Sequence, residues 1–227
     1  MTISAAHLTR AAGLFAVVSG VLYIIIQFVH PAENVATVTG NAWAIVGYMT
    51  IAMAVLGLIG VTGIYLRQVT ESGLLGLIGL VLFGLFFLLV TAFTFAETLI
   101  MPPLAAESPR FVDSFLGIFS GAGAQVDLGL LPALNPVAGV LYVLGGALFG
   151  FATFRARVLD RWAALLLALG ALLTPVVSLL PHAIGRFAAI PVGLAMIWLG
   201  YSLWATERRT VAAQRSSDPR LDLSTAT

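Results

Sequence analysis

Six long segments of this chain carry almost no charged side chain, and this feature limits the fold more than any other. They span approximately residues 11–29, 42–66, 73–100, 136–154, 162–181 and 186–204. A helix needs about 20 mainly apolar residues to cross a hydrocarbon core of about 30 Å. Backbone N–H and C=O groups cannot stay unpaired in hydrocarbon, so these segments are helices and not strands of an open sheet. The sequence therefore predicts an all-α integral membrane bundle of six helices, with residues 1–206 as a single transmembrane domain.

The composition agrees with a chain whose main solvent is lipid. It is 60% hydrophobic and 9% charged, whereas soluble domains carry about 25% charged residues. There is no cysteine, which excludes disulfides and thiolate metal sites. All eleven basic residues are arginine, so no lysine is present to form a Schiff base. The net charge of +1 gives no reason to expect a nucleic-acid partner, and the expected surroundings are the bilayer itself.

The arginines indicate how the helices are oriented. Nine of the eleven lie in the two termini, in the connection between the second and third segments, and in that between the fourth and fifth, which all lie on one side of the membrane. Only Arg110 and Arg186 lie on the other side. Cytoplasmic segments of membrane proteins carry the excess of basic residues. The sequence therefore predicts that both termini are cytoplasmic. Arginine in place of lysine, together with abundant alanine and glycine, is typical of a GC-rich bacterial genome, so the expected location is a bacterial cytoplasmic membrane.

The connection from Pro102 to Asn135 is the longest, and the orientation places it outside the cytoplasm. Within it, residues 109–120 are predicted to form a helix, since Ser108 can cap it and Pro109 can occupy its first position. One face of that helix would be apolar, formed by Phe111, Phe115, Ile118 and Phe119. An amphipathic helix of this kind either rests in the lipid headgroups or covers a binding site. We expect its aromatic face to lie in the outer leaflet.

Three further expectations concern helix ends. The 11–29 segment is expected to be a mature helix and not a signal peptide, because its apolar run exceeds the usual length of about 7–15 residues. The 136–154 helix is expected to start with Asn135 as its cap and Pro136 at its first position. The polar segment 207–227 is expected to be a disordered cytoplasmic tail.

Ionisable side chains in or beside the apolar segments gather at one end of the predicted bundle. Glu97 lies in the last turns of the third segment, His30 ends the first, His182 ends the fifth and Arg186 opens the sixth. The predicted orientation places all of them toward the extracytoplasmic side, as it does Asp127 of the long connection. Ionisable residues within membrane segments often mark functional sites. The sequence thus predicts that these five residues form a polar pocket. The pocket is expected to bind a small hydrophobic or amphiphilic ligand, and the helix of the long connection is expected to cover it.

Other interpretations of the same residues stay open. Glu97 could reach the headgroups by helix tilt, and histidines at helix ends are ordinary interface residues. Alternatively, Glu97 could be the catalytic acid of a membrane-embedded enzyme that acts on a lipid or isoprenoid, in the manner of a terpene cyclase, with aromatic rings stabilising a carbocation. Five phenylalanines crowd the same helix: Phe83, Phe86, Phe87, Phe93 and Phe95. Two histidines and a carboxylate could also bind zinc or iron, but no H-E-x-x-H spacing supports a metal site, and neither a metal nor a cofactor is predicted.

A third interpretation rests on small residues at three- and four-residue spacing. Examples are Ala12, Ala16 and Gly20 in the first segment and Gly73, Gly76 and Gly79 in the third. Such spacing lets helices approach closely, either within the bundle or against the helices of a partner. The chain could therefore be a structural subunit of a membrane complex or a homo-oligomer.

The segment "LYVLGGALFGFATFRARVLDRWAALLLALGALL", residues 141–173, resembles a family of bacterial multi-pass membrane proteins of unknown function. The shared feature is a hairpin of two helices joined by R-x-x-x-L-x-R-W-A, and the start "RAAGLFAVVSGVLY" is similar in style. The resemblance implies a six-helix inner-membrane protein. It implies no catalytic residue.

Overall fold

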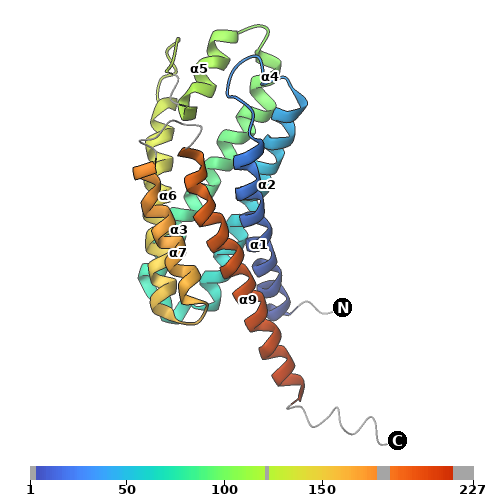
Figure 1. Ribbon diagram of the computed structural model, residues 1–227, viewed down its shortest axis with the longest axis vertical. Coiled ribbons are helices and arrows are strands. Elements are labelled where there is room, and N and C mark those ends of the chain that lie inside the picture. The colour runs from blue at the N-terminus through green and yellow to red at the C-terminus, as the bar shows by residue number, and fades with distance from the viewer. Residues whose placement is uncertain (1–3, 121–122, 178–184, 217–227) are drawn as a thin grey trace, which may run out of the picture.

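The structure is a computed structural model that describes residues 4–120, 123–177 and 185–216. Every regular element in these ranges is a helix, so the all-α prediction is confirmed for the described chain (Figure 1). The long helices are α1 (Ala5–Val29), α2 (Asn41–Arg67), α3 (Val69–Phe95), α6 (Leu134–Ala156), α7 (Arg161–Val177) and α9 (Ile190–Ser216). The short ones are the π-helical turn η1 (Ala96–Ile100), α4 (Met101–Leu104), α5 (Pro109–Ser120) and the 3₁₀ turns η2 (Leu131–Ala133) and η3 (Arg186–Ala189).

The six long helices form a closed ring. Helix α1 packs against α2 and α9, α3 packs against α2 and α6, and α7 packs against α6 and α9. The start of α1 and the end of α9 lie toward the same end of the bundle, and α5 lies at the opposite end (Figure 1). Five helical stretches, which contain α1, α2, α3, α6 and α9, are long and apolar enough to cross a membrane. The described part of α7 is shorter, and the last residues of the predicted fifth segment, 178–181, lie outside the described residues.

Small residues let these helices approach closely, as their spacing predicts. A Cβ atom added at Gly79 of α3 would overlap the backbone nitrogen of Phe149 in α6, and one at Gly20 of α1 would overlap the carbonyl oxygen of Gly193 in α9. Backbones in such contact gain van der Waals energy that bulkier residues would prevent. Gly73 differs from these glycines, because it has a positive φ of 55° at a kink near the start of α3 and an added Cβ atom would meet nothing within 4 Å.

The outer surface of the ring is apolar along its length. Large hydrophobic side chains with more than half of their surface exposed occur on helices from both halves of the chain: Ile45, Leu74, Leu88, Val140, Leu172 and Tyr201. Water would be a poor solvent for such a surface, since soluble monomers expose only small contiguous apolar patches. The exposed faces therefore agree with a bundle that lies in lipid.

Helix α3 does not end where the sequence predicts, and two prolines explain why. An α-helical turn here would require N–H groups from Pro102 and Pro103, which have none, and their rings would crowd the preceding carbonyls. The chain widens instead into the π-helical turn η1, in which the N–H of Met101 donates to the carbonyl of Ala96, five residues earlier. The helix then continues to Leu104, so the apolar stretch runs over Val69–Leu104. Glu97 lies within the widened turn.

Several predicted boundaries need correction. Helix α1 begins at Ala5, six residues earlier than predicted, because Ser4 and His7 form a reciprocal capping box. Helix α6 begins at Leu134 after a 3₁₀ turn, so Asn135 is not its cap. The side-chain amide of Asn135 donates instead to the carbonyl of Ile118 at 2.9 Å, a tertiary contact that the local pattern could not reveal.

The predicted tail from Glu207 is helical up to Ser216, so the prediction of disorder is wrong for these ten residues. The reason is that the first polar turn has an ion-pair partner on α2 and an aromatic contact within α9 itself. Glu207 pairs with Arg67 at the end of α2, with 2.7 Å between carboxylate and guanidinium, and the Arg208 guanidinium lies 4.6 Å from the ring centre of Trp204. Residues 217–227 lie outside the described residues.

Helix α5 has the bounds that its capping signals predict, but its aromatic face does not point to lipid. Phe115 is 5% exposed, and its ring stacks on Phe93 of α3 with 4.7 Å between ring centres. Phe119 meets Phe93 edge-on at 4.5 Å. The expectation that this face lies in the outer leaflet is therefore wrong, because α3 and the 30–40 connection offer a protein surface with the same apolar character. The helix forms a cap over one end of the ring.

Candidate functional site

A cavity of about 370 Å³ lies inside the ring, at the end that α5 covers. Residues of α1, α2, α3, α6 and α7 border it, together with the connection after α1, α5 and the η3 turn that leads into α9. This volume falls in the range of about 300–1,000 Å³ that is typical of small-molecule sites.

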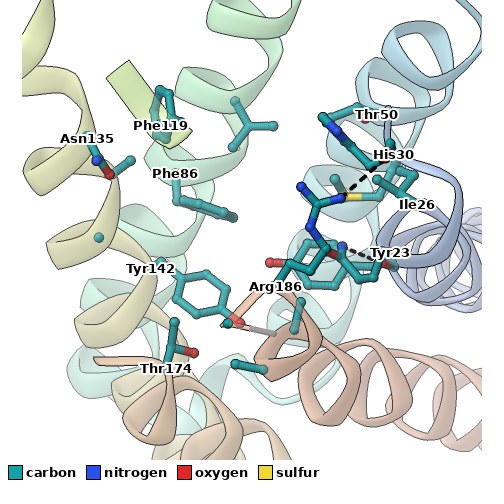
Figure 2. Close-up of a pocket in the computed structure, with 18 of the residues that line it drawn as sticks. Tyr23, Ile26, His30, Thr50, Phe86, Phe119, Asn135, Tyr142, Thr174 and Arg186 are labelled. Atoms are coloured by element: carbon teal, nitrogen blue, oxygen red, sulfur yellow. Dashed lines mark hydrogen bonds between the residues drawn. The ribbon is translucent and has the colours of Figure 1, made fainter. Parts of the chain in front are cut away.

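The outer end of the cavity, the one nearer α5, carries three ionisable side chains. Arg186 of η3 extends toward α1, where its Nη1 donates to the carbonyl oxygen of His30 at 3.4 Å (Figure 2). Its Nη2 lies 3.7 Å from a carboxylate oxygen of Glu33, which is also 3.8 Å from His30 Nδ1. The Nδ1 atom of His30 lies 2.8 Å from the carbonyl oxygen of Pro31 and donates to it when it carries the ring proton. Arg186 and Glu33 are 19% and 13% exposed, so this ion pair is largely screened from solvent.

The walls of the cavity are apolar, and one is aromatic whereas the other is formed by non-aromatic side chains. Phe86 of α3 and Phe119 of α5 line one wall, and the ring of Tyr142 continues it, with 4.9 Å between the ring centres of Phe86 and Tyr142 (Figure 2). Ile26 of α1 and Met53 of α2 line the opposite wall. Such walls favour a ligand with apolar groups, because burial against them removes hydrocarbon from water.

The inner end of the cavity holds a group of hydroxyls. Tyr23 of α1, Tyr142 of α6 and Thr174 of α7 all line it, and the Tyr142 hydroxyl lies next to the other two. Tyr142 is 5% exposed, yet its hydroxyl has no hydrogen bond of normal geometry to any described residue. Buried hydroxyls are nearly always hydrogen-bonded, and one without a partner calls for an explanation.

Glu97 lines a separate cavity of about 40 Å³ beside the large one. His30 and Thr50 border both cavities and so separate them. The position of Glu97 follows from the π-helical turn, in which its own carbonyl has no backbone donor because residue 102 is proline. The indole nitrogen of Trp43 donates to that carbonyl at 2.9 Å and fixes the turn against α2. The small cavity has room for one or two water molecules or for the polar end of a ligand.

The predicted site residues therefore separate into three groups. His30 and Arg186 lie together at the large cavity, and Glu97 shares the small cavity with His30. Asp127 lies apart from both, exposed in the long connection, where its carboxylate accepts the N–H of Gly129 at 2.8 Å. That contact is local, so Asp127 stabilises a turn and does not line the cavity. His182 lies outside the described residues.

Sequence reasoning missed most of the cavity lining, although part of it left a signal. Tyr23, Gln27 and His30 are four and three residues apart, which places them on one face of α1. The three polar side chains in an otherwise apolar segment could have identified that face. Tyr142 gave no comparable signal, because its partners come from distant parts of the chain, whereas Glu33 lies only three residues from His30.

The geometry separates the groups that a carbocation mechanism or a metal site would need. Besides His30, the aromatic residues of the large cavity are Tyr23, Phe86, Phe119 and Tyr142, and none of them lines the small cavity of Glu97. Among the described residues, that cavity has one aromatic ring besides the imidazole of His30, that of Trp43. The acid and the aromatic walls that a carbocation would need are thus in different cavities. Among the described residues, no three His, Asp or Glu side chains gather as a metal-ligand set. What the arrangement offers directly is reversible binding of a molecule that is mainly apolar.

A scan against protein-family models found no match, and no curated protein or solved structure is significantly similar to this chain. The functional argument therefore rests on the residues and their geometry.

Proposed function

We propose that this chain is a six-helix protein of the bacterial cytoplasmic membrane that binds a small hydrophobic or amphiphilic molecule in the cavity beneath α5. In this proposal both termini are cytoplasmic, α7 completes the sixth span, and α5 caps the bundle on the extracytoplasmic side. The arginine distribution supports the orientation, since nine of eleven arginines fall on the side of the termini.

The observation that carries the proposal is the cavity itself. It combines apolar walls with polar groups at both ends, the arrangement that orients an amphiphile in a binding site. His30 and Arg186 form the polar outer end, and Glu97 lies beyond His30 in the adjoining small cavity. Helix α5 limits access from outside, because the Phe119 side chain forms part of the wall.

The proposal is tested by photo-crosslinking in a native-like bilayer. The full chain is purified, placed in phosphatidylcholine nanodiscs and irradiated with a long-chain alcohol that carries a diazirine in its chain. We expect the labelled peptides to contain the cavity face of α1, residues 23–30, and that of α6, residues 135–142. An excess of unlabelled alcohol should compete for these positions. Labelling confined to outward residues such as Leu74 and Leu172, without competition, would contradict the proposal.

A further inference from the structure

The charges of Arg186 and Glu33, which border the cavity, cancel one another. Arg186 and Glu33 are the only Arg, Lys, Asp or Glu side chains among the described lining residues, and they lie 3.7 Å apart. The neighbouring segment 178–184, "SLLPHAI", contains no residue of these four types. A ligand with a full charge would therefore leave water without gaining an unpaired counterion. Removing an ion from water costs several kcal/mol when no partner compensates it.

The inner end of the cavity offers a hydroxyl donor, that of Tyr142, beside the hydroxyls of Tyr23 and Thr174. The Tyr142 hydroxyl is buried and makes no hydrogen bond of normal geometry within the described chain. The two side-chain amides of α1 and α6 that border the cavity already have partners. The amide of Gln27 donates to the carbonyl of Tyr23 at 2.8 Å, and that of Asn135 donates to the carbonyl of Ile118. A phenol hydroxyl donates readily to a carbonyl, ether or alcohol oxygen.

We infer that the ligand is an uncharged lipid with a carbonyl or hydroxyl oxygen, and that this oxygen accepts a hydrogen bond from the Tyr142 hydroxyl at the inner end of the cavity. This inference rests on the proposed function and specifies its ligand class. The apolar part of the ligand lies between Phe86 and Phe119 on one side and Ile26 and Met53 on the other. Charged amphiphiles of the same length are excluded, because the Arg186–Glu33 pair leaves no net charge to receive them.

The test compares probes whose chains differ by at most one carbon and whose polar groups differ. The probes are decan-2-one, 1-decanol, decyl sulfate, decyltrimethylammonium and the hydrocarbon undecane. Binding of each to the full-length protein in phosphatidylcholine nanodiscs is measured at pH 7.5 by competition with the photoreactive alcohol. We expect the ketone and the alcohol to compete at least about tenfold more strongly than either ion, since one uncompensated charge costs more than the roughly 1.4 kcal/mol that corresponds to a tenfold change.

Replacing Tyr142 by phenylalanine isolates the hydroxyl. The ring keeps its contacts with Phe83 and Phe86, so the fold is preserved. We expect Tyr142→Phe to weaken binding of decan-2-one about fivefold, the size of one net hydrogen bond, and to leave binding of undecane unchanged. Tyr201→Phe is the matched control, because Tyr201 is 59% exposed on the outer face of α9 and does not line the cavity.

The outcomes separate the inference from the function on which it rests. If decyl sulfate or decyltrimethylammonium competes as strongly as the ketone, or if Tyr142→Phe leaves the affinity for the ketone unchanged, the inference is wrong while the cavity remains a binding site. If none of the five probes competes and the photoreactive alcohol labels no cavity residue, the proposed function itself is wrong.

Discussion

The indole nitrogen of Trp43 lies 2.9 Å from the carbonyl oxygen of Glu97 and donates a hydrogen bond to it. This single contact joins the start of α2 to the π-helical turn that follows α3. It supplies the donor that the Pro102–Pro103 pair cannot provide. The position of Glu97 beside His30 depends on that turn.

Replacing Trp43 by phenylalanine should therefore destabilise the outer end of the bundle. The change leaves a partly buried carbonyl without a donor, which costs about 1–3 kcal/mol. Thermal unfolding of the detergent-purified protein, followed by circular dichroism, measures the loss. Trp162→Phe serves as the control, because Trp162 is 59% exposed and donates no hydrogen bond to another described helix. Equal losses in the two variants would show that the Trp43 contact has no special role.

Helix α5 should depend on Phe115 for its attachment. Phe115→Ala removes a buried ring that stacks on Phe93, and such truncations in a core cost about 3–5 kcal/mol. We expect amide exchange over residues 109–120 to accelerate strongly in this variant, because the cap loses its main anchor. Phe151→Ala is the control, because it removes the same atoms from an outward position that is 48% exposed. Amide exchange in α5 should not change in this variant. Unchanged exchange in Phe115→Ala would indicate that α5 is held by its other contacts.

Close contact between α3 and α6 should make Gly79 intolerant of substitution. In Gly79→Ala the added methyl overlaps the backbone of Phe149, so the two helices must separate. Overpacking of this kind costs about 1–3 kcal/mol. At Gly139 an added Cβ meets nothing within 4 Å, and alanine should be neutral or stabilising there, since glycine within a helix costs about 0.5–1 kcal/mol relative to alanine. Melting temperatures of the two variants in one detergent give the comparison. A Gly79→Ala protein as stable as Gly139→Ala would contradict the packing described here.

The proposed orientation is tested by reporter fusions. Fusions after Arg67, Arg157 and Arg208 should report a cytoplasmic position, and a fusion near Glu107 an extracytoplasmic one. The Arg157 position is the most informative, because Arg155, Arg157 and Arg161 lie together at the turn between α6 and α7. An extracytoplasmic signal at Arg157 would reverse the orientation and place α5 in the cytoplasm.

The sequence predicted those parts of the structure that depend on local pattern. Apolar runs identified the helices, and the Ser108–Pro109 pair identified the start of α5. The aromatic stripe of α5 predicted a buried face but could not name what buries it. Phe93 and lipid are equally apolar partners, and only the tertiary arrangement of α3 and α5 decides between them.

The candidate site was predicted only where its residues lie at helix ends. His30 and Arg186 meet because α1 and α9 are neighbours in the ring, and Glu33 joins them from the connection after α1. The inner hydroxyls come from α1, α6 and α7, which are distant along the chain. Nothing in the local sequence of any one helix indicates that its neighbours present hydroxyls at the same depth. The pairing of helices around the ring sets that depth, and a continuous apolar run does not encode it.

The central claim is that the cavity beneath α5 is a ligand site, and filling it tests that claim most directly. Gly139 lines the cavity and has open space around it, whereas its neighbour Val140 does not line it and is 56% exposed on the outer face. The measurement is the yield of photo-crosslinking by the diazirine alcohol in the wild type, Gly139→Phe and Val140→Phe, each in phosphatidylcholine nanodiscs. We predict that Gly139→Phe loses labelling of residues 23–30 and 135–142 while its melting temperature stays close to that of the wild type. Val140→Phe should be labelled as strongly as the wild type. Equal labelling of those residues in Gly139→Phe would contradict the account.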